Sequence, residues 1–253
     1  MEKITARHGI ASTPYARIYY KESGQGTPLL MLHGNAETHL VFEYYEKKLS
    51  REYHTILMDS RAHGRSKINP AYADLEFSIT DMAGDVAALL DTLHIKSCIL
   101  VGFSDGANIA LEFASLFPSR TIAVIAVSGN SSPDGLILPA RILFTGEYYA
   151  LKAVTTICQR LTGKIPPALF RARQLTSLLC NAPMMTAEQL KSIQAPVLLI
   201  AGTRDLVKVS HSRLLSRLIP HAQLLLMKGA THTSMFIRKH FYLNAIRTFL
   251  RQL

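Results

Sequence analysis

The sequence has no tryptophan, only three cysteines among 253 residues, and no apolar run of 18 residues or more. Because a transmembrane helix needs about 20 mostly apolar residues, no integral membrane association is expected. The cysteines, Cys98, Cys158 and Cys180, are odd in number and lack Cys-x-x-Cys spacing. Neither a disulfide framework nor a zinc ribbon is therefore expected. Reduced thiols point to a cytoplasmic location.

Acidic residues are also scarce, since 18 Asp and Glu stand against 28 Lys and Arg and give a formal net charge of +10. This balance favours acidic partners but identifies none. There is no long Lys/Arg run and no basic patch interleaved with aromatics, so we expect no nucleic-acid partner. The first ten residues lack the apolar segment of a secretion signal, and none is expected.

Apolar residues make up 48% of the chain, which is enough for a sizeable core. Short apolar runs alternate with helix-like segments, and this pattern predicts an α/β fold with a mostly parallel sheet covered by helices on both faces. An opening hairpin is expected at 4–9 and 16–23. Further strands are predicted at 28–34, 54–60, 97–103, 121–128, 196–202 and 222–229, with helices at 78–93, at 105–116, after Val207 and after Met235.

The segment between the sixth and seventh predicted strands departs from this alternation. It reads as two or three amphipathic helices separated by Gly163 and Pro166-Pro167. We interpret 131–194 as a helical cap over the strand ends, and 1–130 with 195–253 as the core domain. The cap has two open interpretations: its apolar residues line a substrate pocket, or they pack on the domain below, as such residues more often do. They are Leu143, Phe144, Tyr148, Tyr149, Leu169 and Phe170.

The strongest local motif is Gly102-Phe103-Ser104-Asp105-Gly106, between a predicted strand and a predicted helix. This context is that of a nucleophile elbow, in which a tight turn presents a serine above the sheet. The glycines leave space that larger side chains would fill. An incidental serine in a glycine-rich turn is the alternative explanation.

A serine needs a base, and histidine has a suitable pKa near neutral pH. Of ten histidines, His232 stands out because it follows the last predicted strand, at the edge where ligands bind in such sheets. A carboxylate must orient that histidine. Asp205 follows the preceding strand and gives the chain order Ser, Asp, His, with Asp134 as the second candidate.

The oxyanion of an acyl-transfer intermediate needs backbone donors. The segment Leu32-His33-Gly34-Asn35 ends a strand, so the N–H groups of Asn35 and Asp105 are the candidates. We expect His33 to have a structural role. The Asp105 side chain either complements the start of its helix or contacts substrate.

Together these segments resemble the α/β-hydrolase superfamily over nearly the whole chain. The matching segments, in order, are His33-Gly34, Asp59-Ser60-Arg61-Ala62-His63-Gly64-Arg65-Ser66, Gly102 to Gly106, Asp205 and His232. The second segment departs from the family at Ala62, where a glycine is usual. The resemblance implies a central sheet, a helical cap after the sixth strand, no metal and no organic cofactor.

The resemblance also implies that Ser104 is the nucleophile, that His232 is base and then acid, and that Asp205 orients it. We therefore expect a serine hydrolase that cleaves a small carboxylic ester or thioester, with Phe103, Phe144 and Tyr148 as candidate substrate contacts. The same triad also serves carbon–carbon bond hydrolases and perhydrolases. A non-catalytic ligand-binding protein on this fold is a further alternative, as is a binder of polyanions or membrane surfaces. Homo-oligomers are compatible with the sequence.

Overall fold

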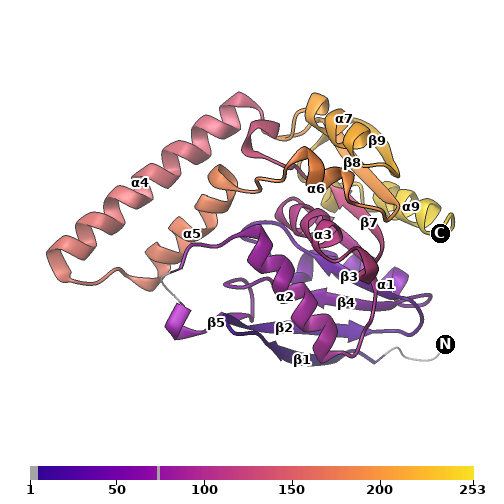
Figure 1. Ribbon diagram of the computed structural model, residues 1–253, viewed down its shortest axis with the longest axis horizontal. Helices are drawn as coiled ribbons and strands as arrows, with labels where there is room; N and C mark the ends of the chain where they lie inside the picture. The colour runs from indigo at the N-terminus through magenta and orange to yellow at the C-terminus, as the bar shows by residue number, and fades with distance from the viewer. Residues whose placement is uncertain (1–4, 73–74) are drawn as a thin grey trace.

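A mostly parallel sheet runs through the computed structural model, which describes residues 5–72 and 75–253 (Figure 1). Within that part the strand order is β1-β2-β4-β3-β6-β7-β8-β9, and short β5 pairs with β2. The strands are β1 Arg7–Ser12, β2 Ala16–Ser23, β3 Pro28–Leu32, β4 His54–Met58, β5 Lys67–Ile68, β6 Cys98–Phe103, β7 Thr121–Val127, β8 Val197–Arg204 and β9 Ala222–Thr231. From β4 to β9 in this order the neighbours are parallel, whereas β1, β2 and β5 pair antiparallel. The expected α/β-hydrolase fold is confirmed.

Each central strand divides its apolar residues between two cores, because successive side chains point to opposite faces of a sheet. On β3, Leu30 and Leu32 join one core, and Leu29 and Met31 join the other. Both faces are covered, so the strands are apolar throughout. Each fully buried side chain of this kind contributes about 1.5–3 kcal/mol.

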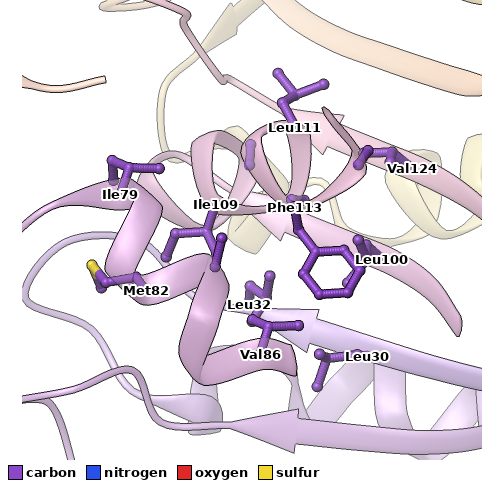
Figure 2. Close-up of a cluster of buried hydrophobic side chains, with 14 of the residues drawn as sticks. Leu30, Leu32, Ile79, Met82, Val86, Leu100, Ile109, Leu111, Phe113 and Val124 are labelled. Atoms are coloured by element: carbon purple, nitrogen blue, oxygen red, sulfur yellow. The ribbon is translucent and has the colours of Figure 1, made fainter. Parts of the chain in front are cut away.

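Helices α2 and α3 cover one face of the sheet, with α6 and α7 beside them, and α1 and α9 cover the other face. Figure 2 shows residues from β3, β6 and β7 packed against residues of α2 and α3. The helices are α1 Glu43–Leu49, α2 Ile79–Thr92, α3 Asp105–Leu116, α6 Ala187–Lys191, α7 Val209–Leu218, α8 Ser234–Ile237 and α9 Lys239–Leu250, with short 3₁₀ turns at His39–Phe42, Pro70–Tyr72, Pro118–Arg120 and Pro133–Gly135.

Two helices between β7 and β8 form an antiparallel pair that projects beyond the sheet (Figure 1). They are α4 Leu138–Thr162 and α5 Pro167–Asn181, which we call the α4–α5 hairpin. Gly163 ends α4 in a left-handed conformation, φ 69°, and Pro167 begins α5, as the sequence predicted. The described residues contain no helix with the length and apolar character needed to span a bilayer.

The first hairpin differs from its prediction. The strand expected at 4–9 is Arg7–Ser12, since the N–H of Thr13 bonds the carbonyl of Ala16 at 2.8 Å and places the turn later; Ile4 lies outside the described residues. The short strand β5 was not predicted. Ala62, where the resembled family has glycine, adopts φ 61°, a left-handed conformation that glycine tolerates more readily.

Candidate active site

Ser104 lies in the turn between β6 and α3 with φ 53° and ψ −119°. For a residue with a Cβ atom such a conformation costs about 1–3 kcal/mol and persists only where the surroundings enforce it. The Ser104 N–H donates to the carbonyl of Val127 on β7 at 2.9 Å, which fixes the turn against the sheet. This is the elbow geometry expected from the sequence.

The two glycines of the motif are required by close backbone contacts. A Cβ atom on Gly102 would lie 2.2 Å from the carbonyl oxygen of Gly106, and one on Gly106 would lie 2.0 Å from the carbonyl oxygen of Leu32. Real Cβ atoms essentially never come so close. The start of α3 therefore sits directly on β3 and β6, with Ser104 held above the sheet.

His232 follows β9 and lies between Ser104 and Asp205. Its Nε2 is 3.0 Å from Ser104 Oγ, and its Nδ1 is 2.6 Å from Asp205 Oδ1. Three segments separated by as many as 128 positions thus form one hydrogen-bonded chain. With Nδ1 donating to the carboxylate, Nε2 is free to accept the serine proton.

Asp205 follows the buried part of β8 and is only 6% exposed. Burial by itself raises the pKa of this carboxyl, but hydrogen bonds from His232 and Ser128 outweigh it, so the pKa lies below its ordinary value. Ser128 Oγ donates to Asp205 Oδ2 at 2.6 Å. Ser128 was not among the predicted site residues, although its place as a polar residue directly after β7 was a usable signal.

The second candidate acid, Asp134, is not near His232. Its carboxylate is 78% exposed and pairs with Arg141 at 2.7 Å. The polar residue Asn130, also after β7, does not bond to His232 but accepts through Oδ1 from Asn108 Nδ2 at 3.2 Å. The structure thus places Asp205, and not Asp134, against the histidine.

The two candidate oxyanion donors are Asn35, in the loop after β3, and Asp105, directly after Ser104. Asp105 is the first residue of α3, so its N–H has no partner within the helix. Among the described residues no hydrogen bond occupies the N–H of Asn35. Both residues line the same cavity as Ser104. Two residues whose backbone N–H groups have no hydrogen-bond partner among the described residues thus line the cavity that contains Ser104.

The side chain of Asp105 is buried, and Asn35 Nδ2 donates to its Oδ2 at 2.9 Å. Burial raises the pKa of Asp105, with the Asn35 hydrogen bond opposing the shift. Asn35 Nδ2 also lies 2.9 Å from the carbonyl oxygen of Leu175 on α5. One amide thus links the loop after β3, the helix after Ser104 and the α4–α5 hairpin.

Two neutral histidines form hydrogen bonds that hold the loop after β3, which contains Asn35. His33 Nδ1 donates to the carbonyl of Gly34 at 2.7 Å, and its Nε2 accepts from the N–H of Ser60 at 3.0 Å. His63 Nε2 accepts from the N–H of Ala36 at 3.1 Å. Burial lowers the pKa of His33 to about 4, and burial also lowers the pKa of His63. His33 is therefore structural, as expected, and His63 is an additional support that the sequence analysis did not identify.

Glu37 is another polar residue beside the site, and it was not among the predicted site residues. Its Oε2 accepts from the N–H of Gly34 at 2.9 Å, and the residue lines the cavity. Burial raises the pKa of Glu37, while the hydrogen bond from Gly34 opposes that shift. Its position three residues after Gly34 is the local signal that would have identified it.

A cavity of about 500 Å³ opens above Ser104, between the strand ends and the α4–α5 hairpin. Its lining residues are Asn35, Ala36, Glu37, Phe103, Ser104, Asp105, Ser128, Asn130, Leu136, Phe144, Glu147, Ala172, Leu175, Thr176, Leu179, Ala182, Leu206, Val207, His232 and Thr233. This volume is within the range of small-molecule sites.

The three candidate substrate contacts are placed differently. Phe103 and Phe144 line the cavity, and the Phe103 ring lies 5.0 Å from the His232 ring. Tyr148 does not line it, which corrects the expectation; its ring contacts Tyr149, centroid to centroid at 5.4 Å. One turn of α4 separates Tyr148 from Phe144 and carries it past the cavity.

The cavity is acidic although the protein is basic. Three carboxylates, Glu37, Asp105 and Glu147, line it, and no Lys or Arg is among its described lining residues. Arg173 of α5 instead pairs with Glu76 at 3.0 Å. No group of three or more His, Cys, Asp or Glu side chains in the described ranges is arranged to hold a metal ion.

Comparison with known proteins agrees with the observed fold. A family model described as alpha/beta hydrolase fold matches residues 27–147. The 2-(acetamidomethylene)succinate hydrolase of Mesorhizobium japonicum is 28% identical over 254 aligned residues, which cover 91% of this chain and 90% of that protein.

Two solved structures are similar along almost their whole length. Est816, described as an N-acyl homoserine lactone degrading enzyme, is 27% identical with a TM-score of 0.76, covering 95% of this chain and 100% of that one. The esterase RhEst1 from Rhodococcus sp. is 26% identical with a TM-score of 0.77, covering 98% and 99%. The names of the three relatives thus describe a hydrolase, a lactone-degrading enzyme and an esterase.

Proposed function

Because the protein belongs to the α/β-hydrolase superfamily, we propose that it is a serine hydrolase that cleaves small carboxylic esters or thioesters. The observation that carries this proposal is the continuous hydrogen-bonded chain from Ser104 through His232 to Asp205. A serine is a weak nucleophile at neutral pH, and this arrangement supplies the base that activates it. The strained turn at Ser104 further supports a catalytic role.

In the first half of the proposed reaction, Ser104 Oγ attacks the carbonyl carbon of the ester and its proton passes to His232 Nε2. The carbonyl oxygen becomes an oxyanion, which the N–H groups of Asn35 and Asp105 stabilise. Asp205 remains ionised, holds the imidazole in place and stabilises its positive charge. Its lowered pKa suits this role, since a carboxylate is required.

In the second step, His232 gives its proton to the leaving alcohol or thiol as the bond to the carbonyl carbon breaks. Ser104 then carries the acyl group as an ester. Water replaces the alcohol, loses a proton to His232 and attacks the acyl carbon. The bond from that carbon to Ser104 Oγ then breaks, His232 returns the proton to Oγ, and the carboxylic acid leaves. No metal or organic cofactor is needed for this sequence.

We also propose that 131–194 acts as a cap that selects the substrate. This assignment is supported by Phe144, Glu147 and Leu175, which line the cavity from the α4–α5 hairpin while the reacting residues come from the sheet. The cap would then determine which substrates bind, and the core, 1–130 with 195–253, would supply the reacting residues.

The charge of the cavity favours neutral or positively charged substrates. Glu37, Asp105 and Glu147 would repel an acyl group that carries further carboxylates, and no described lining residue is cationic apart from protonated His232. The dicarboxylic substrate in the name of the Mesorhizobium japonicum hydrolase is therefore a poor fit. An uncharged ester or lactone, as in the names of RhEst1 and Est816, suits the cavity better.

Carbon–carbon bond hydrolysis or perhydrolysis by the same triad, and ligand binding without catalysis, are the competing functions. A fluorophosphonate probe and the chromogenic substrate p-nitrophenyl butyrate separate them. We expect the probe to label Ser104, as located by mass spectrometry, and we expect ester turnover. Ser104→Ala should lower turnover by roughly 10⁴-fold or more, because the triad members act as a unit.

Ser119→Ala is the matched control, since Ser119 is exposed on a surface turn. It should keep full activity and full labelling. Equal turnover by the wild type and Ser104→Ala would eliminate the serine-hydrolase assignment. Labelling of Ser104 without ester turnover would direct attention to the competing functions.

A further inference from the structure

The outer face of α4 is apolar and uncovered. Seven of the large hydrophobic residues exposed on the described protein lie on this one helix: Leu138, Ile142, Leu143, Tyr149, Val154, Ile157 and Leu161. Leu161 is 80% exposed, which is the largest fraction in that group. Exposed apolar surface of this kind marks an interaction site when it is contiguous.

Helical spacing makes these residues contiguous. Leu138, Ile142 and Tyr149 are separated by four and seven positions and therefore form one row along the helix. A second row, Leu143, Val154 and Leu161, has spacings of eleven and seven and lies roughly a third of a turn around the helix, with Ile157 between the two rows. The remaining face of α4 contains Phe144, Glu147 and buried Thr155, and it faces the cavity and α5. One side of α4 thus serves the cavity, and the other is without a partner in the described protein.

The α4–α5 hairpin is also strongly basic. Its residues 138–181 contain Arg141, Lys152, Arg160, Lys164, Arg171 and Arg173 against a single acidic residue, Glu147, for a net charge of +5. The ion pairs of Arg141 and Arg173 are with residues outside the hairpin. Lys152, Arg160, Lys164 and Arg171 are exposed and form no ion pair with any described residue.

We propose that the outer face of α4 docks on an anionic membrane surface. An apolar helix face bordered by lysine and arginine is the arrangement that inserts shallowly among lipid headgroups and is attracted by anionic lipids. A second copy of this chain would bring another +5 hairpin against the first, and that like-charge contact is unfavourable. Charge complementarity therefore favours lipid over self-association. Docking on this face leaves the cavity side of α4 unaltered and does not depend on Ser104.

Vesicle binding of the intact protein tests the proposal. Co-sedimentation should be measured with vesicles of phosphatidylcholine alone, and with vesicles in which roughly one-third is phosphatidylglycerol. Binding to the anionic vesicles should be at least roughly tenfold tighter, and should weaken strongly between about 0.05 M and about 0.5 M salt. The variant Leu161→Glu and the double variant Arg160→Glu/Lys164→Glu should each weaken it roughly tenfold or more.

The matched control is Phe241→Glu, since Phe241 is another exposed hydrophobic residue, 66% exposed, on α9. It should change vesicle binding less than roughly twofold. Turnover of a water-soluble ester by the α4 variants reports whether they are folded and keeps this test separate from that of Ser104. Equal binding to both kinds of vesicle, or binding that Leu161→Glu leaves intact, would refute the proposal. A dimer in sedimentation velocity that Leu161→Glu dissociates would assign the face to a second copy instead.

Discussion

The side chains of Asn35 and Asp105 are hydrogen-bonded to each other, Nδ2 to Oδ2, at 2.9 Å, and the backbone N–H groups of the same two residues are the donors that we assign to the oxyanion. The two donors come from loops 70 positions apart in the sequence. We therefore expect the bond between the side chains to hold the two N–H groups at a set separation. Preorganised donors of this kind stabilise a transition state without rearranging during the reaction.

Asn35→Ala tests this relationship, because it keeps the backbone N–H and removes the two hydrogen bonds of the side chain. We expect kcat for p-nitrophenyl butyrate to fall by roughly 10-fold with little change in KM, since the effect is on the transition state. Asn244→Ala, at an exposed position on α9, should leave both constants unchanged. An Asn35→Ala enzyme with the wild-type kcat would show that the side-chain bond does not position the donors.

Gly106→Ala should prevent correct folding of the elbow. The new methyl group would lie 2.0 Å from the carbonyl oxygen of Leu32, so β3 and α3 would have to separate. We expect a loss of roughly 3 kcal/mol or more in the free energy of unfolding, together with loss of activity. Urea titration followed by circular dichroism measures it.

Gly84→Ala on α2 is the matched control, because nothing lies within 4 Å of its added Cβ atom. There the same change should raise the free energy of unfolding by about 0.5–1 kcal/mol, as alanine is the better helix former. If both variants had the same stability, close contact could not be the reason for glycine at position 106.

Asp105→Asn should stabilise the protein at neutral pH. Burial raises the pKa of Asp105, so the folded protein holds that proton more tightly than the unfolded chain. The free energy of unfolding of the wild type therefore decreases as the pH rises above the ordinary pKa of aspartic acid, about 3.9. Asp105→Asn has no carboxyl to ionise, so this decrease does not occur. The side-chain oxygen of the new asparagine can still accept from Asn35 Nδ2.

The advantage of Asp105→Asn should shrink as the pH falls from 7 toward about 4, where the unfolded carboxyl also becomes protonated. Denaturant midpoints across this range measure it. The control is Asp91→Asn, because the Asp91 side chain is 69% exposed. A variant that is less stable than the wild type at pH 7 would contradict the argument.

Glu147→Lys should change the charge preference of the cavity. Glu147 lines the cavity from α4, and its Oε1 is 3.4 Å from Thr176 Oγ1. The matched substrates are p-nitrophenyl butyrate, which is neutral, and the mono-p-nitrophenyl ester of succinate, which is anionic. We expect the wild type to prefer the neutral ester by roughly tenfold or more in kcat/KM.

The lysine variant should reduce that preference several-fold, and Glu147→Gln should have an intermediate effect. Raising the salt concentration should weaken the preference of the wild type, because screening reduces the repulsion. A wild-type enzyme that favours the succinate ester would contradict the assignment of neutral or cationic substrates.

Much of the core was predictable because its signals are local. Apolar runs that end in small or polar residues located six strands to within a few residues, and Ser104, Asp205 and His232 each follow such a run. The order of parallel strands then brings their carboxyl ends to one edge of the sheet. That the three side chains meet follows from topology rather than from any one motif.

What could not be predicted depends on tertiary contacts. The support of Asp205 by Ser128 and of the Asn35 loop by His63 joins residues that are distant in the sequence. The two interpretations of the apolar residues in α4 were both incomplete. Phe144 lines the cavity, whereas Leu143 and Tyr149 are 65% and 60% exposed and neither line it nor pack on the domain below. Helical periodicity defines a face but does not say what covers it.

The α4–α5 hairpin, which forms part of the cavity wall, is one uninterrupted stretch of the chain between β7 and β8. This stretch can therefore be exchanged as a unit without altering Ser104, Asp205 or His232, which lie outside it. The hydrogen bond from Asn35 to the carbonyl of Leu175 uses a main-chain acceptor, which survives any replacement that keeps α5 helical. The same property makes the insertion a natural target for laboratory redesign of selectivity.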